Sequence, residues 1–256
     1  MGCEIFAPTW LGSVLFNLSE FNQPLQVDMS IDFEPKLNRN IGPENELKEL
    51  SKLFLDKEIS TIELMGAFQY HTSSYTKHRQ LFFNNFRFRE SLENQVDNAL
   101  LNMGLMDKQV ICVHLRRGDY LNFDKKHPLF WGRSFEATYR ALSDILLSSF
   151  SNGIVYICSD DIEYCERVFI NMNIPHLTFK NIFSDLDQNS QLMVDFMMMV
   201  RSNVLLISNS SLSFAAAMLN KNSRLFLRPC PKEDRYISFD PWNSHVLLPQ
   251  TPYQFN

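Results

Sequence analysis

Short apolar segments alternate with longer segments of helical periodicity over the second half of this 256-residue chain, and no other feature restricts its fold as strongly. The short apolar segments lie at residues 110–113, 154–158, 177–179, 204–208 and 224–227. Helical periodicity lies between them, at residues 134–149, 162–172, 190–201 and 211–220. Strands that alternate with helices form parallel sheets with right-handed crossovers. The pattern predicts an α/β fold, with a doubly wound C-terminal lobe and a mostly parallel sheet over residues 106–256.

Residues 1–105 differ from this pattern. Prolines at positions 8, 24, 35 and 43 separate short apolar pieces. A helix is expected over residues 44–55, a strand over residues 61–64, and one or two helices over residues 75–102. A chain of this length is long enough for one large domain or two small lobes. We predict a separate N-terminal lobe over residues 1–105.

Composition narrows the class of protein. A formal net charge of −5 argues against a nucleic-acid-binding protein, which usually carries a basic surface. The apolar runs are far shorter than the roughly 20 residues that span a bilayer. The cysteine count of 5 is odd and no pair has metal-ligand spacing, which favours free thiols in a reducing compartment. Because the first residues do not resemble a secretion signal, we expect a cytoplasmic protein with at most peripheral membrane association.

The predicted strand at residues 110–113 runs into a basic junction that contains Arg116, Arg117, Gly118 and Asp119. Open α/β sheets bind ligands at the carboxyl ends of their strands. A guanidinium group offers a fixed fork of N–H donors that suits phosphate oxygens. The junction therefore predicts an anion site, and a structural ion pair between one arginine and Asp119 is the alternative.

A second polar cluster, at residues 208–213, lies between a predicted strand and an apolar helix. Asn209, Ser210 and Ser211 bring hydroxyl and amide groups to the start of that helix. Such a helix start binds anions through its first N–H groups and the helix dipole. Ordinary N-capping is the alternative. Two anion-directed segments at strand ends of one sheet predict a diphosphate ligand.

Carboxylates follow another strand and interrupt an apolar helix. Asp160 and Asp161 can bind a ribose or a metal ion, or cap the following helix. Asp195 lies in an apolar helix, where a carboxylate needs a partner such as a guanine edge or a backbone group. Asp185 and Asp187 match a weak three-residue metal motif. No metal site is predicted.

Together these motifs resemble the α-1,2-fucosyltransferase family, glycosyltransferase family 11. The resemblance is carried by HLRRGDY at residues 114–120, SDD at 159–161, Asp195, and ISNSSLSFAAA at 207–217. GAFQY at residues 66–70 resembles the Gly-Tyr-Phe-Gln stretch of that family. The resemblance implies a GT-B-like fold of two Rossmann-like lobes, GDP-fucose as donor, a galactose-containing glycan as acceptor, and inversion at the fucose anomeric carbon. It implies no metal ion and no cofactor.

The resemblance also implies roles for single residues. Arg116 would hold the β-phosphate of GDP and stabilise the departing diphosphate, while Arg117 and Asp119 would shape the loop. His114 and Asp195 would address guanine. The other expected donor-binding residues are Asp160, Asn209, Ser210 and Ser211.

Two points depart from the family or extend it. Family members begin with a strand and a Gly-Gly-x-Gly-Asn-Gln loop that nothing in residues 1–54 resembles, so we expect an incomplete N-terminal lobe. Asp124 lies ten residues after His114, the offset at which related α-1,6-fucosyltransferases place a catalytic glutamate, and is the predicted general base.

The leading functional hypothesis is transfer of L-fucose from GDP-fucose to the 2-hydroxyl of a galactoside. A GDP-sugar-binding protein without catalysis is one alternative. A metal-dependent GT-A glycosyltransferase that uses Asp185 and Asp187 is the other.

Overall fold

The chain divides into two compact units in the computed structural model. The N-terminal unit comprises Met1–Arg89 and Asn243–Val246, and the C-terminal unit comprises Glu90–Trp242 and Leu247–Asn256. The structure describes residues 15–16, 28–32, 52, 55–56, 60–65, 71–122, 128–131, 133–148, 150–183 and 188–248. The helix predicted over residues 44–55 and the motif at residues 66–70 lie almost wholly outside these ranges.

The N-terminal unit contains a two-stranded parallel sheet of β1 (Met29–Asp32) and β2 (Ile62–Met65). The carboxylate of Asp28 accepts hydrogen bonds from the backbone N–H groups of Ser60 and Thr61, which lowers its pKa to about 2. The 3-10 helix η1 (Thr72–His78) and α3 (Arg79–Asn85) follow. The strand predicted over residues 61–64 is confirmed.

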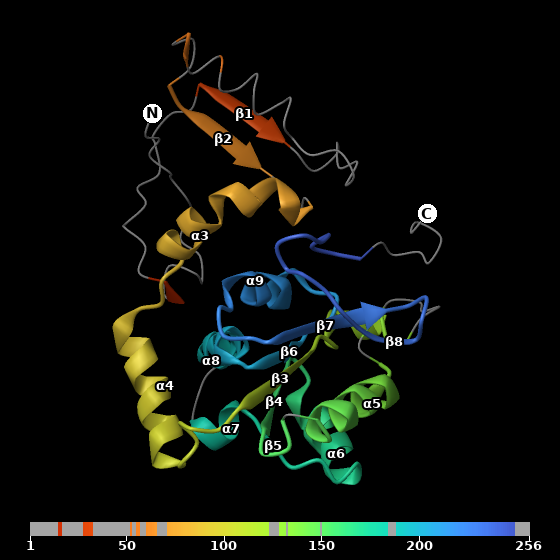
Figure 1. Cartoon of the computed structure of the whole chain (residues 1–256). Helices are drawn as coiled ribbons and strands as arrows, with labels where there is room; N and C mark the ends of the chain where they lie inside the picture. The colour runs from red at the N-terminus through yellow and green to blue at the C-terminus, as the bar shows by residue number, and fades with distance from the viewer. Residues whose placement is uncertain are drawn as a thin grey trace. The chain divides into compact units, whose positions relative to one another are not determined.

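A six-stranded sheet forms the centre of the C-terminal unit, in the order β5-β4-β3-β6-β7-β8 (Figure 1). Neighbouring strands pair in parallel, except that β7 and β8 are antiparallel. The strands are β3 (Val110–Leu115), β4 (Ile154–Ser159), β5 (His176–Leu177), β6 (Val204–Leu206), β7 (Leu225–Cys230) and β8 (Arg235–Ser238). Strands β3, β4 and β6 are almost wholly buried, because helices cover both faces of the sheet.

Helices α8 and α9 lie on one face of this sheet, and α5 and α6 lie on the other (Figure 1). The helices of the unit are α4 (Glu90–Asn102), α5 (Phe135–Leu146), α6 (Ile162–Asn171), α7 (Phe179–Ile182), α8 (Gln188–Arg201) and α9 (Ser211–Leu219). Arg201, at the end of α8, pairs with Glu93 and Asp97 of α4. These contacts join α4 to the C-terminal unit. The lobe boundary predicted after residue 105 stays a prediction.

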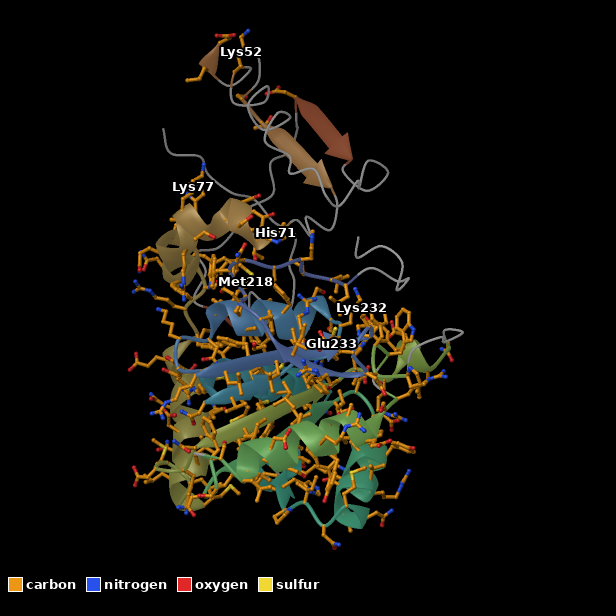
Figure 2. The ribbon with its side chains drawn as sticks, turned by 45° about the vertical axis from the view of Figure 1, so that its right-hand side comes forward. Lys52, His71, Lys77, Met218, Lys232 and Glu233 are labelled. Carbon is orange, nitrogen blue, oxygen red and sulfur yellow. The ribbon has the colours of Figure 1, made fainter. Side chains whose placement is uncertain are left out.

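The sheet confirms the predicted α/β class and the doubly wound, mostly parallel sheet of the C-terminal lobe. Two details of the prediction are wrong. The strand predicted over residues 177–179 ends at Leu177, because Thr178 and Asn181 form a capping box that begins α7 at Phe179. Strand β8 was not predicted, and it follows a turn that carries Lys232 and Glu233 (Figure 2).

The buried residues of the C-terminal unit agree with the sequence pattern. Met197, Met198 and Met199 of α8 are core residues. Cys112, Cys158 and Cys165 are buried free thiols. Within the described ranges, no helix is both long enough and apolar enough to cross a membrane.

Candidate active site

The strand order places a topological switch point between β3 and β6. From β3 the chain continues to β4 and β5 on one side, whereas from β6 it continues to β7 and β8 on the other. Ligands of open α/β sheets bind outside the carboxyl ends of the strands at such a point. The β3 loop (residues 116–119) and the β6 loop (residues 207–210) follow two neighbouring strands there. The two anion-directed segments of the sequence are therefore adjacent.

Arg116 is held between two carboxylates. Its Nη2 atom lies 2.8 Å from Oδ1 of Asp119, and its Nη1 atom lies 2.8 Å from Oδ2 of Asp160. The side chain of Asp119 is 57% exposed and that of Asp160 is 21% exposed. The structural ion pair with Asp119 is thus present, but Arg116 itself is 37% exposed and is open to a further partner.

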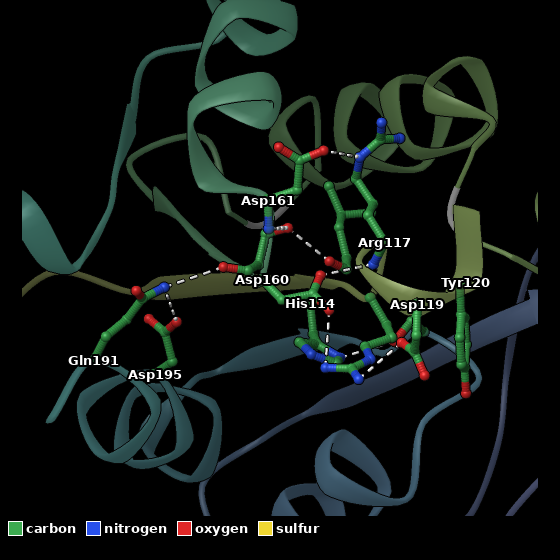
Figure 3. Close-up of polar contacts among 12 residues, drawn as sticks. His114, Arg117, Asp119, Tyr120, Asp160, Asp161, Gln191 and Asp195 are labelled. Atoms are coloured by element: carbon green, nitrogen blue, oxygen red, sulfur yellow. Dashed lines mark hydrogen bonds and ion pairs between the residues drawn. The ribbon is translucent and has the colours of Figure 1, made fainter. Parts of the chain in front are cut away.

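Arg117 is buried and points away from Arg116. Its Nε donates to Oδ2 of Asp161 at 3.1 Å, and its guanidinium lies 4.0 Å from the centre of the Tyr164 ring. Its backbone N–H donates to Oδ1 of Asp160 at 2.7 Å. Arg117 therefore fixes the β3 loop onto the start of α6 (Figure 3). The loop-shaping role predicted for Arg117 in donor binding stays a prediction.

Asp160 and Asp161 do not cap α6. Asp161 is the N-cap residue, yet its side chain makes no capping hydrogen bond and binds Arg117 instead. Asp160 bridges the side chain of Arg116 and the backbone of Arg117. The capping interpretation of this pair is wrong, because the two arginines of the β3 loop compete for both carboxylates.

Gly118 allows this close approach of Asp160. A Cβ atom at position 118 would lie 2.6 Å from Oδ2 and 3.2 Å from Cγ of Asp160. We expect Gly118→Ala to displace the Asp160 carboxylate and to lower the free energy of unfolding by about 1 to 3 kcal/mol, the usual cost of overpacking. Urea unfolding measures this change.

The same substitution made in an Asp160→Ala variant separates this collision from a general effect on the loop. In Asp160→Ala the colliding atoms are gone, so Gly118→Ala should cost much less in that background. Equal costs in the two backgrounds would show that the collision is not the cause.

His114 lies at the end of β3 and faces the β6 loop. Its Nδ1 and the Oγ of Ser208 share a hydrogen bond of 2.8 Å. Burial lowers the pKa of His114 to about 4, so the imidazole is neutral at pH 7. Because Nδ1 already binds Ser208, the neutral imidazole leaves Nε2 as the nitrogen that can meet a base edge.

Asp195 on α8 is only 4% exposed and is bonded to β4. Its Oδ1 accepts a hydrogen bond of 2.9 Å from the hydroxyl of Tyr156, and Gln191 donates to its Oδ2 at 3.5 Å. Burial raises the pKa of Asp195 to about 7. Gln191 also donates to the carbonyl of Ser159, which ties α8 to the end of β4 (Figure 3).

The β6 loop leads into the N-terminus of α9. Ser210 is the N-cap residue, but its side chain makes no capping hydrogen bond, so ordinary N-capping does not explain this serine. Ser211 is exposed in the first turn. Asn209 is buried, and its Oδ1 accepts a hydrogen bond of 2.7 Å from the backbone N–H of Leu248.

Three predicted residues remain untested by geometry. Asp124, Asp185 and Asp187 lie outside the described residues. In the part of the chain that is described, no three histidine, cysteine or acidic side chains are grouped as metal ligands.

The sequence did not indicate the residues that fix the side chains of the site in place. Tyr156 and Gln191 fix Asp195, and Tyr164 stacks on Arg117. Tyr120 donates from its hydroxyl to the carbonyl of Asn209. Tyr120 ends the recognised HLRRGDY motif and Tyr164 follows the SDD motif by three residues, whereas nothing in the sequence pairs Tyr156 with Asp195.

Comparison with known proteins identifies the family of the chain. The family model for glycosyl transferase family 11 matches residues 44–238. An α-1,2-colitosyltransferase from Escherichia coli is 33% identical over 144 residues, which cover 51% of this chain and 44% of that protein. The chain thus spans less than half the length of this curated relative.

Solved fucosyltransferases show a more distant similarity. The α-1,6-fucosyltransferase NodZ, solved with GDP, is 16% identical with a TM-score of 0.49, over 87% of this chain and 73% of that one. NodZ was also solved from Bradyrhizobium at the same TM-score. POFUT1 in complex with GDP-fucose is 13% identical with a TM-score of 0.48, over 75% and 62%. The family assignment rests on the match over residues 44–238, and by that match the chain belongs to glycosyl transferase family 11.

Proposed function

We propose that this chain transfers L-fucose from GDP-fucose to the 2-hydroxyl of a galactoside, with inversion at the fucose anomeric carbon. The observation that carries the proposal is that the loop with Arg116 and the N-terminus of α9 follow two neighbouring strands, β3 and β6, at the switch point. Membership of glycosyl transferase family 11 supports the reaction class. The α-1,2 linkage in the name of the Escherichia coli relative supports the linkage.

The diphosphate of GDP is the leaving group, so its negative charge grows as the bond to fucose breaks. Preorganised donors aimed at developing charge are a large source of catalysis. Arg116 supplies a guanidinium group, and α9 supplies N–H groups and the positive end of its dipole. Asp119 and Asp160 already bind Arg116, so a phosphate replaces one of them. The phosphate displaces the exposed Asp119, whose carboxylate then rotates into solvent.

The base and the ribose bind beside the diphosphate in this proposal. His114 and Asp195 address guanine, and Asp160, which binds Arg116, contacts the ribose. Ser210 and Ser211 cover the phosphates from the start of α9. Asn209 contributes N–H donors, because its Oδ1 already accepts from Leu248 and its carbonyl accepts from Tyr120.

Asp124 is the proposed general base that takes the proton from the acceptor hydroxyl. Replacing it with asparagine is expected to lower kcat by about 100-fold or more, because general-base catalysis contributes roughly that factor. Asn122→Ala, a change two residues away in η2 (Asp119–Asn122), serves as the control and should keep its turnover. A turnover of Asp124→Asn close to wild type would remove Asp124 from the mechanism.

The name of the curated relative, a colitosyltransferase, favours colitose as a second sugar to test. The non-catalytic alternative predicts GDP binding without turnover. The GT-A alternative predicts that a strong chelator abolishes activity, whereas the metal-independent proposal predicts no effect.

The experiment that tests the function is a transfer assay. The chain is incubated with GDP-fucose or GDP-colitose and a panel of β-galactosides, with and without chelator, and GDP release is measured. Nuclear magnetic resonance of the product identifies the linkage. Fucose on the galactose 2-hydroxyl is the expected product. GDP binding without release for any acceptor would support the non-catalytic alternative instead.

A further inference from the structure

Tyr120 connects the β3 loop to the β6 loop. It lies in η2, directly after Gly118 and Asp119. Its hydroxyl donates a hydrogen bond of 2.7 Å to the backbone carbonyl of Asn209. Asn209 immediately precedes the N-cap residue of α9. One phenol therefore joins the segment that carries Arg116 to the segment that begins α9.

The ring of Tyr120 is fixed on its other sides. The Trp131 ring packs edge-on against it, with ring centres 5.2 Å apart. Phe130, Trp131 and Leu248 form a buried cluster against which Tyr120 packs. Burial raises the pKa of Tyr120, so its hydroxyl stays protonated and remains a donor. The guanidinium of Arg116 lies 5.8 Å from the centre of the same ring.

Asn209 is fixed as well, so the hydrogen bond joins two ordered segments. Its side-chain Oδ1 accepts from the backbone N–H of Leu248, a member of the same cluster. On the inner side, His114 and Ser208 make a second connection between β3 and the β6 loop. The two connections together tie the segment that carries Arg116 to the segment that begins α9.

We propose that Tyr120 is a positioning residue that sets the distance between Arg116 and the N-terminus of α9, and that it thereby selects a diphosphate over a monophosphate. This inference rests on the proposed function, in which the two phosphates of GDP engage both loops. GDP needs both anion-binding groups at a fixed separation. GMP has one phosphate and engages only one of them in addition to the base contacts.

The test compares the affinities of GDP and GMP in wild type, Tyr120→Phe and Tyr139→Phe by titration calorimetry. Tyr120→Phe keeps the ring and its packing and removes only the hydroxyl. Tyr139 is an exposed tyrosine of α5 and is the matched control. We expect Tyr120→Phe to weaken GDP binding about tenfold and GMP binding by less than about twofold, whereas Tyr139→Phe changes neither.

A merely structural role of Tyr120 predicts a different result. If its hydroxyl only stabilised the fold, Tyr120→Phe would lower the melting temperature and leave the ratio of GDP to GMP affinity unchanged. Equal weakening, or an unchanged preference for GDP in Tyr120→Phe, overturns the inference and leaves the proposed function intact. A wild-type chain that does not prefer GDP to GMP overturns both.

Discussion

Arg116→Ala is expected to lower kcat/KM for GDP-fucose about 100-fold or more, the usual cost of removing one preorganised donor from a developing anion. The guanidinium group offers two parallel N–H donors to a phosphate, and alanine offers none. Steady-state kinetics with varied GDP-fucose measures the change, and kcat/KM reports the lost stabilisation of the transition state. Normal kinetics of this variant would remove Arg116 from the site.

Two further variants separate charge, geometry and folding. Arg116→Lys keeps the charge but loses the fork of donors, so it should recover only part of the activity. Arg140→Ala removes an exposed arginine of α5 that pairs with Glu136, and it should leave the kinetics unchanged. Thermal unfolding of each variant shows whether a loss of activity follows from a loss of folded protein.

Asp195→Asn is expected to remove a pH dependence of stability that wild type shows near neutral pH. Burial raises the pKa of Asp195 to about 7, whereas an unfolded aspartate has a pKa near ~3.9. The folded chain therefore binds this proton more tightly than the unfolded chain does. The stabilisation by the proton is full below pH ~3.9 and is lost as the pH rises through about 7. The whole effect is at most about 4 kcal/mol.

The measurement is the difference in free energy of unfolding between Asp195→Asn and wild type, by urea unfolding at pH 5 and pH 8. The difference is needed because His114, whose pKa is lowered to about 4, titrates in the acid range with the opposite sign. Asparagine keeps an oxygen for the Tyr156 hydroxyl, so the variant should gain stability relative to wild type at pH 8. Asp144→Asn, on the exposed side of α5, is the control. If this difference in free energy of unfolding is the same at both pH values, burial does not raise the pKa of Asp195.

The alternation of apolar and periodic segments was sufficient to predict the parallel strands, because buried strands need continuous apolar runs. It could not predict β8, an edge strand whose place depends on pairing with β7. The pattern also predicted a strand through Phe179, which is wrong because a capping box at Thr178 begins a helix there. The sequence predicted that the β3 and β6 loops lie at strand ends of one sheet. It did not predict that β3 and β6 are neighbours, since strand order is a tertiary property.

Side-chain partners were the least predictable part of the site. Asp160 and Asp161 have the sequence of a helix cap, yet the arginines of the β3 loop bind both carboxylates. The partner of Asp195 is Tyr156, which comes from a strand 39 residues away. Such pairings follow from packing of α8 on the sheet, and no local pattern encodes them.

The central claim is that Arg116 and the N-terminus of α9 together bind the diphosphate of a GDP-sugar. The most direct test is a crystal structure of the chain with GDP. We predict the β-phosphate against the guanidinium of Arg116, Asp119 turned away from that group, and a phosphate oxygen at the first turn of α9. GDP bound elsewhere, with Arg116 still paired to both Asp119 and Asp160, would contradict the claim.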